Sequence, residues 1–491
     1  MDIQRRKLLK GAVGTATAAT LAGCAGIESS GSSIRKPNFL FLSLDDCNDW
    51  LGFLGGNPDT RTPNLDKLAA RSTIFDRAYC SAPGCNQSRA SLMTGRNPAS
   101  TGVYGNRQPF RMSPLAKDAL TLPQLLKANG YYTEGAGKIF HNKFPDPPSW
   151  DNFFPDRDTQ FLPRVPPPRE TTGPRDAKGK ILGELEWGSY QGKLDRTRDW
   201  VSIAHTRAAF ARGLQEPFFF ACGINLPHVP WFVPAKYMEM FAPDRITLPQ
   251  VLDGDEDDLP ALGKKAFNRM RVPNKALHDQ HLVREAVAAY LASIASVDVM
   301  VGHVLEALAA SPYADNTVIV VWSDHGYHLG EKTNWSKFTL WEEATRVPFL
   351  IHDPRRPAAR VAAPVSLVDI YPTIAAMAGV APPPGLDGRS LVPLLDTPAL
   401  DWNDPVITTN YRANHGVRDR DWRYIRYSDG GEELYDHRGD PMEWRNLAND
   451  PQYRSIIERL AQKLPAFDAP DAPEVEWPED NPALIAALEA E

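Results

Sequence analysis

The distribution of apolar positions along the chain predicts buried strands separated by amphipathic helices. Four short apolar runs are rich in aromatic and β-branched residues, as is typical of strands that are buried on both faces. They span residues 38–44, 217–222, 317–322 and 347–352. Apolar positions recur at helical spacing over about residues 284–310 and again near residues 367–378. Strands that alternate with helices favour an α/β fold, in which helices cover a large parallel or mixed sheet.

Three of these strands run directly into polar side chains. Asp45 and Asp46 follow the first strand, residues 225–228 follow the second, and Asp324 with His325 follows the third. Binding sites of open α/β sheets collect beyond the carboxyl ends of the strands. The sequence therefore predicts one active site that is assembled from distant segments.

The pattern changes after about residue 396, where the apolar runs become shorter. Three short strands and one helix are predicted there: around Val406, Tyr424 and Leu434, and over residues 456–464. We therefore expect a catalytic domain over residues 37–398 and a smaller C-terminal α+β subdomain over residues 399–491.

Two segments predict irregular structure. Residues 144–168 are rich in proline and aromatic residues and predict a long ordered loop. Residues 253–258 (DGDEDD) are acidic, but they lack the full spacing of an EF-hand. A solvated turn is therefore a better interpretation of this acidic run than a calcium loop.

The first 24 residues have the pattern of an export signal. Residues 4–10 (QRRKLLK) resemble a twin-arginine signal, and residues 21–24 (LAGC) resemble the lipobox of a bacterial lipoprotein. Cys24 would then carry the lipid, and residues 25–36 would form a flexible tether. We expect an exported periplasmic or cell-surface lipoprotein whose only membrane contact is its lipid anchor.

Charge and cysteine content narrow the function further. The chain has 491 residues and a formal net charge of −7, and removal of the basic signal makes it more negative. This balance gives no support for nucleic-acid binding, and an anionic substrate must be attracted by a local site. Five cysteines are present without a CxxC pair or a Cys/His spacing, which argues against structural zinc. A disulfide among Cys47, Cys80 and Cys222 stays open.

Cys85 opens the segment with the most informative chemistry, CNQSRASLMTGR at residues 85–96. A proline and a glycine precede it, and the following residues suit a helix that ends at Gly95. The N–H groups at a helix N-terminus favour an anion, and Arg89 lies one turn further on the same face. A thiol in such a field is a candidate nucleophile, and the alternative is a buried structural thiol.

This segment resembles the signature of the type I sulfatases, which belong to the alkaline phosphatase superfamily. Cys85, Arg89, Thr94 and Gly95 match the family pattern, whereas Gln87 replaces its usual proline or alanine. The resemblance implies an alkaline-phosphatase-like fold, with a large mixed sheet between helices. It also implies that a formylglycine-generating enzyme oxidises Cys85 to formylglycine, whose hydrate is the nucleophile of a sulfuric ester hydrolase.

The resemblance extends to the acidic residues at the strand ends. Asp45, Asp46, Asp324, His325 and the residue at position 85 would bind a divalent cation. Carboxylate oxygens are the ligands that Ca²⁺ and Mg²⁺ prefer. We therefore expect Ca²⁺ or Mg²⁺ at this position.

Four further residues match short elements of the same family. Lys138 and His141 lie in a G-K-x-x-H element, His228 in a P-H-x-P element, and Lys337 in a W-S-K element. By resemblance, the lysines would neutralise the sulfate oxygens and His228 would protonate the leaving oxygen. His141 would be the base in sulfate release, and Arg89 would hold the alkoxide of the nucleophile.

The Asp-His pair resembles the iduronate-2-sulfatase branch, which implies a sulfated sugar or a small sulfate ester as substrate. Candidate contacts to the sugar are Arg164, Arg169, Trp187 and residues 412–420. Two alternatives stay open. A phosphodiester or phosphonate hydrolase of the same superfamily would use the same groups, and a non-catalytic glycan-binding protein would result if Cys85 is not converted.

Overall fold

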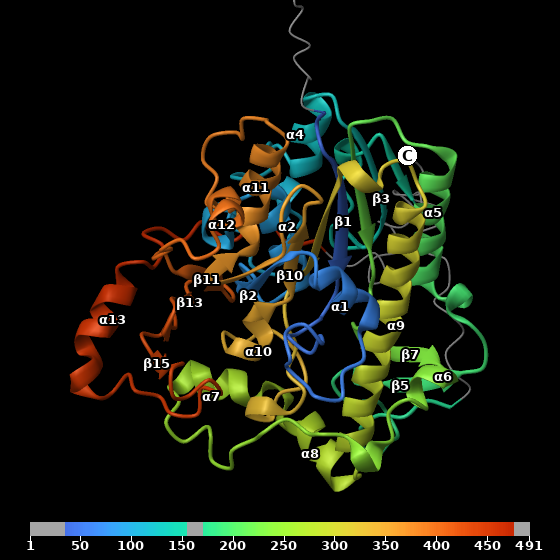
Figure 1. The fold of residues 1–491 in the computed structure, drawn as a ribbon. Helices are drawn as coiled ribbons and strands as arrows, with labels where there is room; N and C mark the ends of the chain where they lie inside the picture. Colours follow the sequence, from blue (N-terminus) through green and yellow to red (C-terminus); the bar gives the residue numbers. More distant parts are fainter. Residues whose placement is uncertain (1–34, 155–169, 476–491) are drawn as a thin grey trace, which may run out of the picture. The chain divides into compact units, whose positions relative to one another are not determined.

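A nine-stranded mixed sheet forms the centre of the fold (Figure 1). The computed structural model describes residues 35–154 and 170–475. The predicted export signal, nearly all of the tether, and the candidate sugar contacts Arg164 and Arg169 lie outside the described residues. The strand order is β11 (Ala359–Ser366), β2 (Thr73–Tyr79), β10 (Phe349–His352), β8 (Thr317–Ser323), β1 (Asn38–Leu44), β6 (Phe218–Gly223), β3 (Tyr132–Gly137) and β4 (Asn152–Phe154), and β9 (Arg346–Val347) pairs with β2.

The central strand β1 shows why the sheet is covered on both faces. Its leucines, Leu40, Leu42 and Leu44, lie in one hydrophobic cluster, and its phenylalanines, Phe39 and Phe41, lie in another. Helices α1 (Pro63–Ala69), α5 (Arg198–Arg212) and α9 (Val283–Ala309) cover the leucine face. Helices α2 (Cys85–Thr94), α4 (Leu122–Ala128) and α11 (Ile370–Met377) cover the phenylalanine face. In Figure 1 the two sets lie on opposite sides of the sheet.

Helix α9 is the long amphipathic helix that the sequence predicts. It is long and apolar enough to cross a membrane by length and composition, and among the described helices it alone meets that test. Most of its side chains are buried, including Tyr290, Ile294 and Val301. The burial of this helix identifies it as a core helix.

A second sheet follows the main one along the chain. Strands β12 (Val406–Thr409), β13 (His415–Arg418), β14 (Trp422–Arg426) and β15 (Glu432–Asp436) form an antiparallel meander. Helix α13 (Arg454–Ala461) packs its Ile457 and Leu460 against Tyr424 and Leu434 of this sheet. The expected α+β C-terminal subdomain is confirmed, whereas its boundary at residue 398 stays a prediction.

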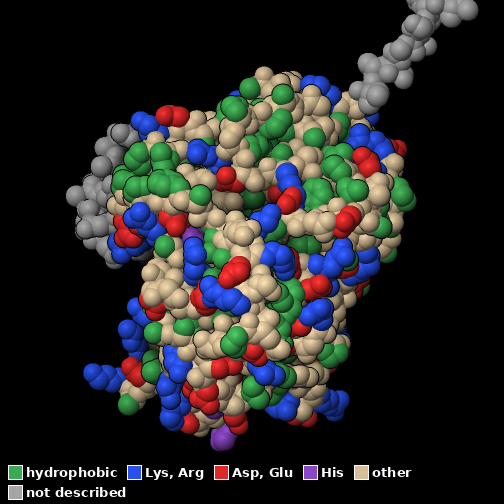
Figure 2. All heavy atoms as spheres, turned by 90° about the vertical axis from the view of Figure 1, so that its left-hand side faces the viewer, with side chains coloured by type: hydrophobic (Ala, Val, Ile, Leu, Met, Phe, Trp, Pro, Cys, Tyr) green, Lys and Arg blue, Asp and Glu red, His purple; other side chains and the backbone are tan. Residues whose placement is uncertain are grey.

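The protein surface near the small antiparallel sheet carries side chains of both charges (Figure 2). Figure 2 shows the face that is on the left in Figure 1, where α13 and the small sheet lie. Basic and acidic side chains are interspersed over that face, without a broad region of one sign. An anionic substrate that reaches this face is therefore attracted by local groups.

The structure differs from the sequence-based expectations at three places. In the described part of the loop predicted over residues 144–168, β4 adds a parallel edge strand beside β3, and residues 155–168 lie outside the described residues. The strand expected at 347–352 is divided at Pro348 into β9 and β10, because proline has no N–H to donate to a ladder. Residues 253–258 form the expected turn, but Asp255 is buried and accepts hydrogen bonds from Lys332 Nζ at 3.0 and 3.1 Å.

Candidate active site

The ends of three adjacent parallel strands bring the predicted site together. Strand β1 lies between β6 and β8, and its residues Ser43 and Leu44 pair with Gly223 and Ser323. The residues that follow these strands therefore emerge at one edge of the sheet. Asp45 and its neighbour lie next to Asp324 because of this register.

Cys85 lies at the same edge of the sheet. It is the first residue of α2, which belongs to the helical layer on the phenylalanine face of β1. The preceding Gly84 is extended, and a Cβ atom there would lie 2.1 Å from Gln87 Nε2, so that a larger residue would require the Gln87 side chain to move. Gly95 ends the helix in the left-handed region, with φ of 67°. The predicted helix is thus present, with a buried Cys85 at its N-terminus.

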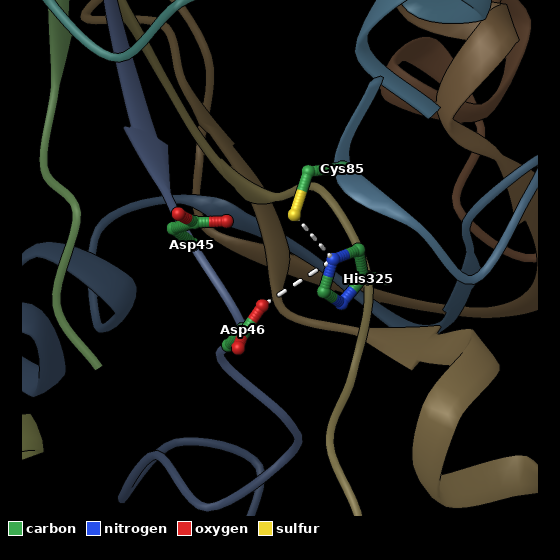
Figure 3. A group of neighbouring side chains, drawn as sticks. All are labelled: Asp45, Asp46, Cys85 and His325. Carbon is green, nitrogen blue, oxygen red and sulfur yellow. Dashed lines mark hydrogen bonds and ion pairs between the residues drawn. The ribbon is translucent and has the colours of Figure 1, made fainter. Parts of the chain in front are cut away.

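Four of the five predicted metal ligands form one cluster (Figure 3). The ligand atoms of Asp45, Asp46, Cys85 and His325 all lie within 4.8 Å of one another. His325 Nε2 is 3.2 Å from Cys85 Sγ and 3.3 Å from Asp46 Oδ1. The fifth residue, Asp324, adjoins the cluster, and its carboxylate accepts hydrogen bonds from the N–H groups of Asp46 and His325.

Two oxygens of the cluster have spare acceptor capacity. Asp45 Oδ1 and Asp46 Oδ2 are buried and accept no hydrogen bond from the described part of the chain. A buried acceptor without a donor costs about 1–3 kcal/mol. Two such oxygens beside an imidazole and a nucleophile are the donor set of a divalent cation such as Ca²⁺ or Mg²⁺. The residues therefore fit the expected ion.

Three buried cations neutralise the carboxylates. Lys138 Nζ forms an ion pair with Asp45. Lys337 Nζ lies 2.6 Å from Asp46 Oδ1 and 3.4 Å from Cys85 Sγ. The third cation, the guanidinium of Arg89 in α2, forms an ion pair with Asp324. Lys138 thus lies against Asp45, and Lys337 lies against both Asp46 and Cys85, where an anionic group would be attracted.

Neighbouring charges determine the protonation state of Asp45 and Lys337 at the site. Burial alone would raise the pKa of Asp45, but Lys138 and His228 outweigh that effect and hold it well below the ordinary value. Burial alone would lower the pKa of Lys337, but Asp46 outweighs it and raises the value. Asp45 and Lys337 are therefore both charged at neutral pH.

Two of the three histidines at the site, His141 and His228, have pKa values that are shifted in opposite directions. Burial, and then the charge of Lys138, lowers the pKa of His141 well below 6.5, so that its imidazole is neutral. Burial alone would lower the pKa of His228 too, but the charge of Asp46 outweighs it and raises the value. His228 Nε2 lies 3.9 Å from Asp46 Oδ2, and its side chain is partly exposed. The lowered pKa of His141 suits a proton acceptor, and the raised pKa of His228 suits a proton donor.

Comparison with known proteins identifies the chain. Residues 37–380 match the family model described as Sulfatase, and residues 330–469 match the model described as N-sulphoglucosamine sulphohydrolase, C-terminal. The chain belongs to the sulfatase family. The expected family, the alkaline-phosphatase-like fold and the class of sulfuric ester hydrolases are confirmed.

Relatives of this sulfatase match it over nearly their whole length. A sulfatase from Formosa agariphila is 35% identical over 450 residues, which cover 89% of this chain and 88% of the relative. Iduronate 2-sulfatase from Mus musculus is 30% identical over 549 residues, covering 89% of this chain and 96% of the relative. The solved structure of a phosphonate monoester hydrolase from Silicibacter pomeroyi superposes with a TM-score of 0.72 at 23% identity, covering 87% of this chain and 94% of the other.

Arg89 of this sulfatase uses its donors on the framework of the site. Its Nε donates to Asp324 Oδ2 at 2.8 Å, and its Nη1 donates to Ser43 Oγ and the carbonyl of Lys138. Its Nη2 donates to the carbonyl of Leu44. The side chain is fully buried and ties α2 to the end of β1, which is the geometry of a positioning residue.

Two hydroxyl groups hold the ligand-bearing turns, and sequence reasoning missed both. Asp46 adopts a left-handed conformation, with φ of 60°, and Tyr290 Oη donates to its carbonyl at 2.9 Å. Ser323 Oγ accepts from the N–H of Cys47 and donates to the carbonyl of His325, each at 3.0 Å. Tyr290 lies on a core helix, so the sequence carries no local signal of its role.

The other described cysteines differ from Cys85. Cys47, Cys80 and Cys222 are free and buried, so the described residues contain no disulfide. Burial raises the pKa of each, to about 12 for Cys222, which keeps them as thiols. They therefore have the character of structural core residues.

Gln87, which departs from the family pattern, is a buried amide inside α2. Neither its Oε1 nor its Nε2 has a hydrogen-bond partner among the described residues. The side chain packs instead beside Gly84, the residue that precedes Cys85. Gln87 is thus accommodated in the fold without a polar role there.

Proposed function

We propose that this sulfatase removes a sulfate ester from a carbohydrate, with a formylglycine formed from Cys85 as its nucleophile. Asp45, Asp46, Asp324 and His325 would hold the divalent cation. The observation that carries the proposal is the position of Cys85 Sγ, 3.2 Å from His325 and 3.4 Å from Lys337, beside carboxylate oxygens that lack donors.

The residues around Cys85 support one division of roles. The hydrated aldehyde would supply one hydroxyl for attack on sulfur and a second for release of sulfate, and the cation would lower the pKa of the attacking hydroxyl. Lys138 and Lys337 bind the sulfate oxygens. His228, whose pKa is raised, donates a proton to the leaving oxygen, and His141, whose pKa is lowered, accepts one during release. Arg89 keeps Asp324 and α2 in place.

The carbohydrate part of the proposal rests on the names of similar proteins. The family model that matches residues 330–469 is described by N-sulphoglucosamine sulphohydrolase, and the mouse relative is iduronate 2-sulfatase. Both names specify a sulfated sugar. A small sulfate ester is the alternative substrate that the same catalytic groups would accept.

Paired assays test the reaction class. The full chain, produced together with a formylglycine-generating enzyme, is assayed on an aryl sulfate, an aryl phosphate and an aryl phosphonate. We expect the sulfate to be the preferred substrate and Cys85→Ala to lose at least about 100-fold in kcat/KM. Cys222→Ala, which removes another buried thiol, is the matched control and retains activity. A preference for the phosphonate would support the rival hydrolase, and full activity of Cys85→Ala would exclude Cys85 as the nucleophile.

We also propose export of the folded, matured protein as a lipoprotein. The support is the pattern of residues 4–10 and 21–24 in the sequence, together with the burial of Cys85, which an oxidising enzyme must reach before the fold closes. Replacing Cys24 by Ser should release the protein from the membrane fraction. Unchanged membrane association would contradict the lipid anchor.

A further inference from the structure

Phe338 forms the wall of the site beside the nucleophile. It follows Lys337 in sequence, and its N–H donates to the carbonyl of Pro83 at 3.0 Å. A Cβ atom on Gly84 would lie 2.8 Å from its ring, so the ring packs against the residue that precedes Cys85. Any group that extends from a bound sulfate toward this side meets the surface of which Phe338 is a part.

Arg269 covers the ring of Phe338. Its guanidinium carbon lies 4.4 Å from the ring centroid, and its Nη1 donates to Tyr411 Oη at 3.3 Å. Arg269 belongs to the short helix η5 (Asn268–Met270) that follows α7 (Ala261–Phe267). Thr333 and Asn334 hold the end of α7 through the carbonyls of Phe267 and Ala266. The loop that presents Lys337 thus also supports the segment that presents Arg269.

Tyr411 arrives from the C-terminal subdomain. It lies in the turn between β12 and β13, and the neighbouring Asn410 donates through Nδ2 to the carbonyl of Phe338 at 2.6 Å. Phe338 and Tyr411 both have left-handed backbones, with φ of 68° and 59°. Such strained residues cluster at binding sites. Three segments far apart in sequence therefore meet beside the catalytic lysine.

The donors of Arg269 are largely unused by the protein. Within the described residues, its one polar contact is the hydroxyl of Tyr411, which leaves Nε and Nη2 for a ligand. Arg412 is one of the sugar contacts expected from the sequence, but its Nη2 donates to the carbonyl of Asp468 and its Nη1 lies 3.9 Å from Asp471 Oδ2. Trp187, another candidate, is buried in the core.

We propose that Arg269, Phe338 and Tyr411 form a subsite for an acidic saccharide unit next to the sulfate that is cleaved. The proposal rests on the proposed function. A planar guanidinium binds a carboxylate or a sulfate through two parallel hydrogen bonds. The exposed ring of Tyr411, which is 48% accessible, offers an apolar face for a sugar ring. The subsite makes this enzyme selective for sulfated polysaccharides that carry a second negative charge.

Selectivity on three disaccharide sulfates tests this subsite in the matured, full-length enzyme. The neighbouring unit carries a carboxylate in the first, a second sulfate in the second, and no charge in the third. We expect wild type to prefer one of the charged substrates, which identifies the anion that is recognised. Arg269→Ala should lower the ratio of kcat/KM for that substrate over the neutral one by about tenfold. Arg269→Lys, which keeps the charge but loses the planar fork, should give an intermediate ratio.

Arg271→Ala is the matched control, because Arg271 is a similarly exposed arginine that bonds only to Asn268 in its own turn. An equal ratio in the Arg269→Ala and Arg271→Ala enzymes would overturn the subsite while the proposed function stands. If wild type cleaves none of the three, the proposed function fails. Binding of the same disaccharides to Cys85→Ala protein then tests the subsite. Adding Arg269→Ala to this protein should lower its affinity for the charged disaccharide and leave its affinity for the neutral one unchanged. Equal affinities for the charged disaccharide with and without Arg269→Ala would refute the subsite.

Discussion

Asp46 combines a left-handed backbone with a buried carboxylate that faces His325 and Lys337. A non-glycine residue in this region costs of order 1–3 kcal/mol and persists only where its surroundings hold it. The hydroxyl of Tyr290 does so, because it donates to the carbonyl of Asp46 and accepts from the N–H of Asn48. The shape of the candidate cation site therefore depends on Tyr290, which is not one of the predicted metal ligands.

Replacing Tyr290 by Phe should weaken cation binding about tenfold, because groups that orient metal ligands contribute about 10–100-fold to affinity. The affinity is measured as the shift of the unfolding temperature during titration with Ca²⁺ and with Mg²⁺, which needs no turnover. Tyr313→Phe is the control, since the Tyr313 hydroxyl accepts from the N–H of Leu214, away from the site. Equal affinity in wild type and Tyr290→Phe would show that the hydroxyl does not position Asp46.

At the scale of elements, the strands that carry the site were predictable and several others were not. Strands β1, β6 and β8 are long apolar runs buried on both faces, so composition alone reveals them. Strand β4 has three residues and lies at an edge, and β13 has four, so neither gives a periodic signal. Acidic residues at the strand ends indicated the candidate cation site. Ser323 bridges two turns of that site, but in the sequence it has no feature beyond its place at the end of a strand.

The junction between the small sheet and the catalytic residues is a buried charge network. Arg423 of β14 forms ion pairs with Glu443 and with Glu342, the first residue of α10 (Glu342–Thr345). His437 lies 2.8 Å from the same Glu443 carboxylate. The guanidinium of Arg423 supplies the positive charge that compensates the carboxylates of Glu342 and Glu443. Removing one partner of a buried pair leaves an uncompensated charge, which costs about 3–5 kcal/mol.

We therefore expect Arg423→Met to lower the free energy of unfolding at neutral pH by about 3–5 kcal/mol in chemical denaturation. Arg438→Ala is the matched control from the same subdomain, since its pair with Asp436 is at the surface and should have no measurable effect. A loss no larger than that of the control would mean that Arg423 does not hold the junction.

The same network predicts how stability depends on pH. Burial alone would raise the pKa of Glu342, but Arg418 and Arg423 outweigh it and hold the value below 4.5. The pKa of Glu443 is lowered likewise, against burial, by Arg423. A lowered folded-state pKa gives stability that is complete above about pH 4.5 and is lost as the pH falls through the folded-state value. The difference in the free energy of unfolding between wild type and Arg423→Met should thus become smaller below about pH 4. A difference that does not change with pH would contradict this assignment.

At the scale of the whole molecule, the site depends on contacts that no local pattern encodes. The Lys337 loop, the segment around Arg269 and the turn at Tyr411 meet only in the folded chain. The family resemblance predicted the fold and the group of residues that meets beside Cys85, because their motifs are short and local. Arg269 lies in no such motif, so its position against the ring of Phe338 required the structure.

Mass spectrometry of the tryptic peptide from Ala78 to Arg89 tests the central claim most directly. The protein is isolated from a host that contains a formylglycine-generating enzyme, and the fraction of peptide with an aldehyde at position 85 is compared with the sulfatase activity of each preparation. We expect the aldehyde to be present despite Gln87, and we expect the activity to rise in proportion to it. Sulfatase activity in a preparation whose position 85 carries only a thiol would show that Cys85 does not act through formylglycine.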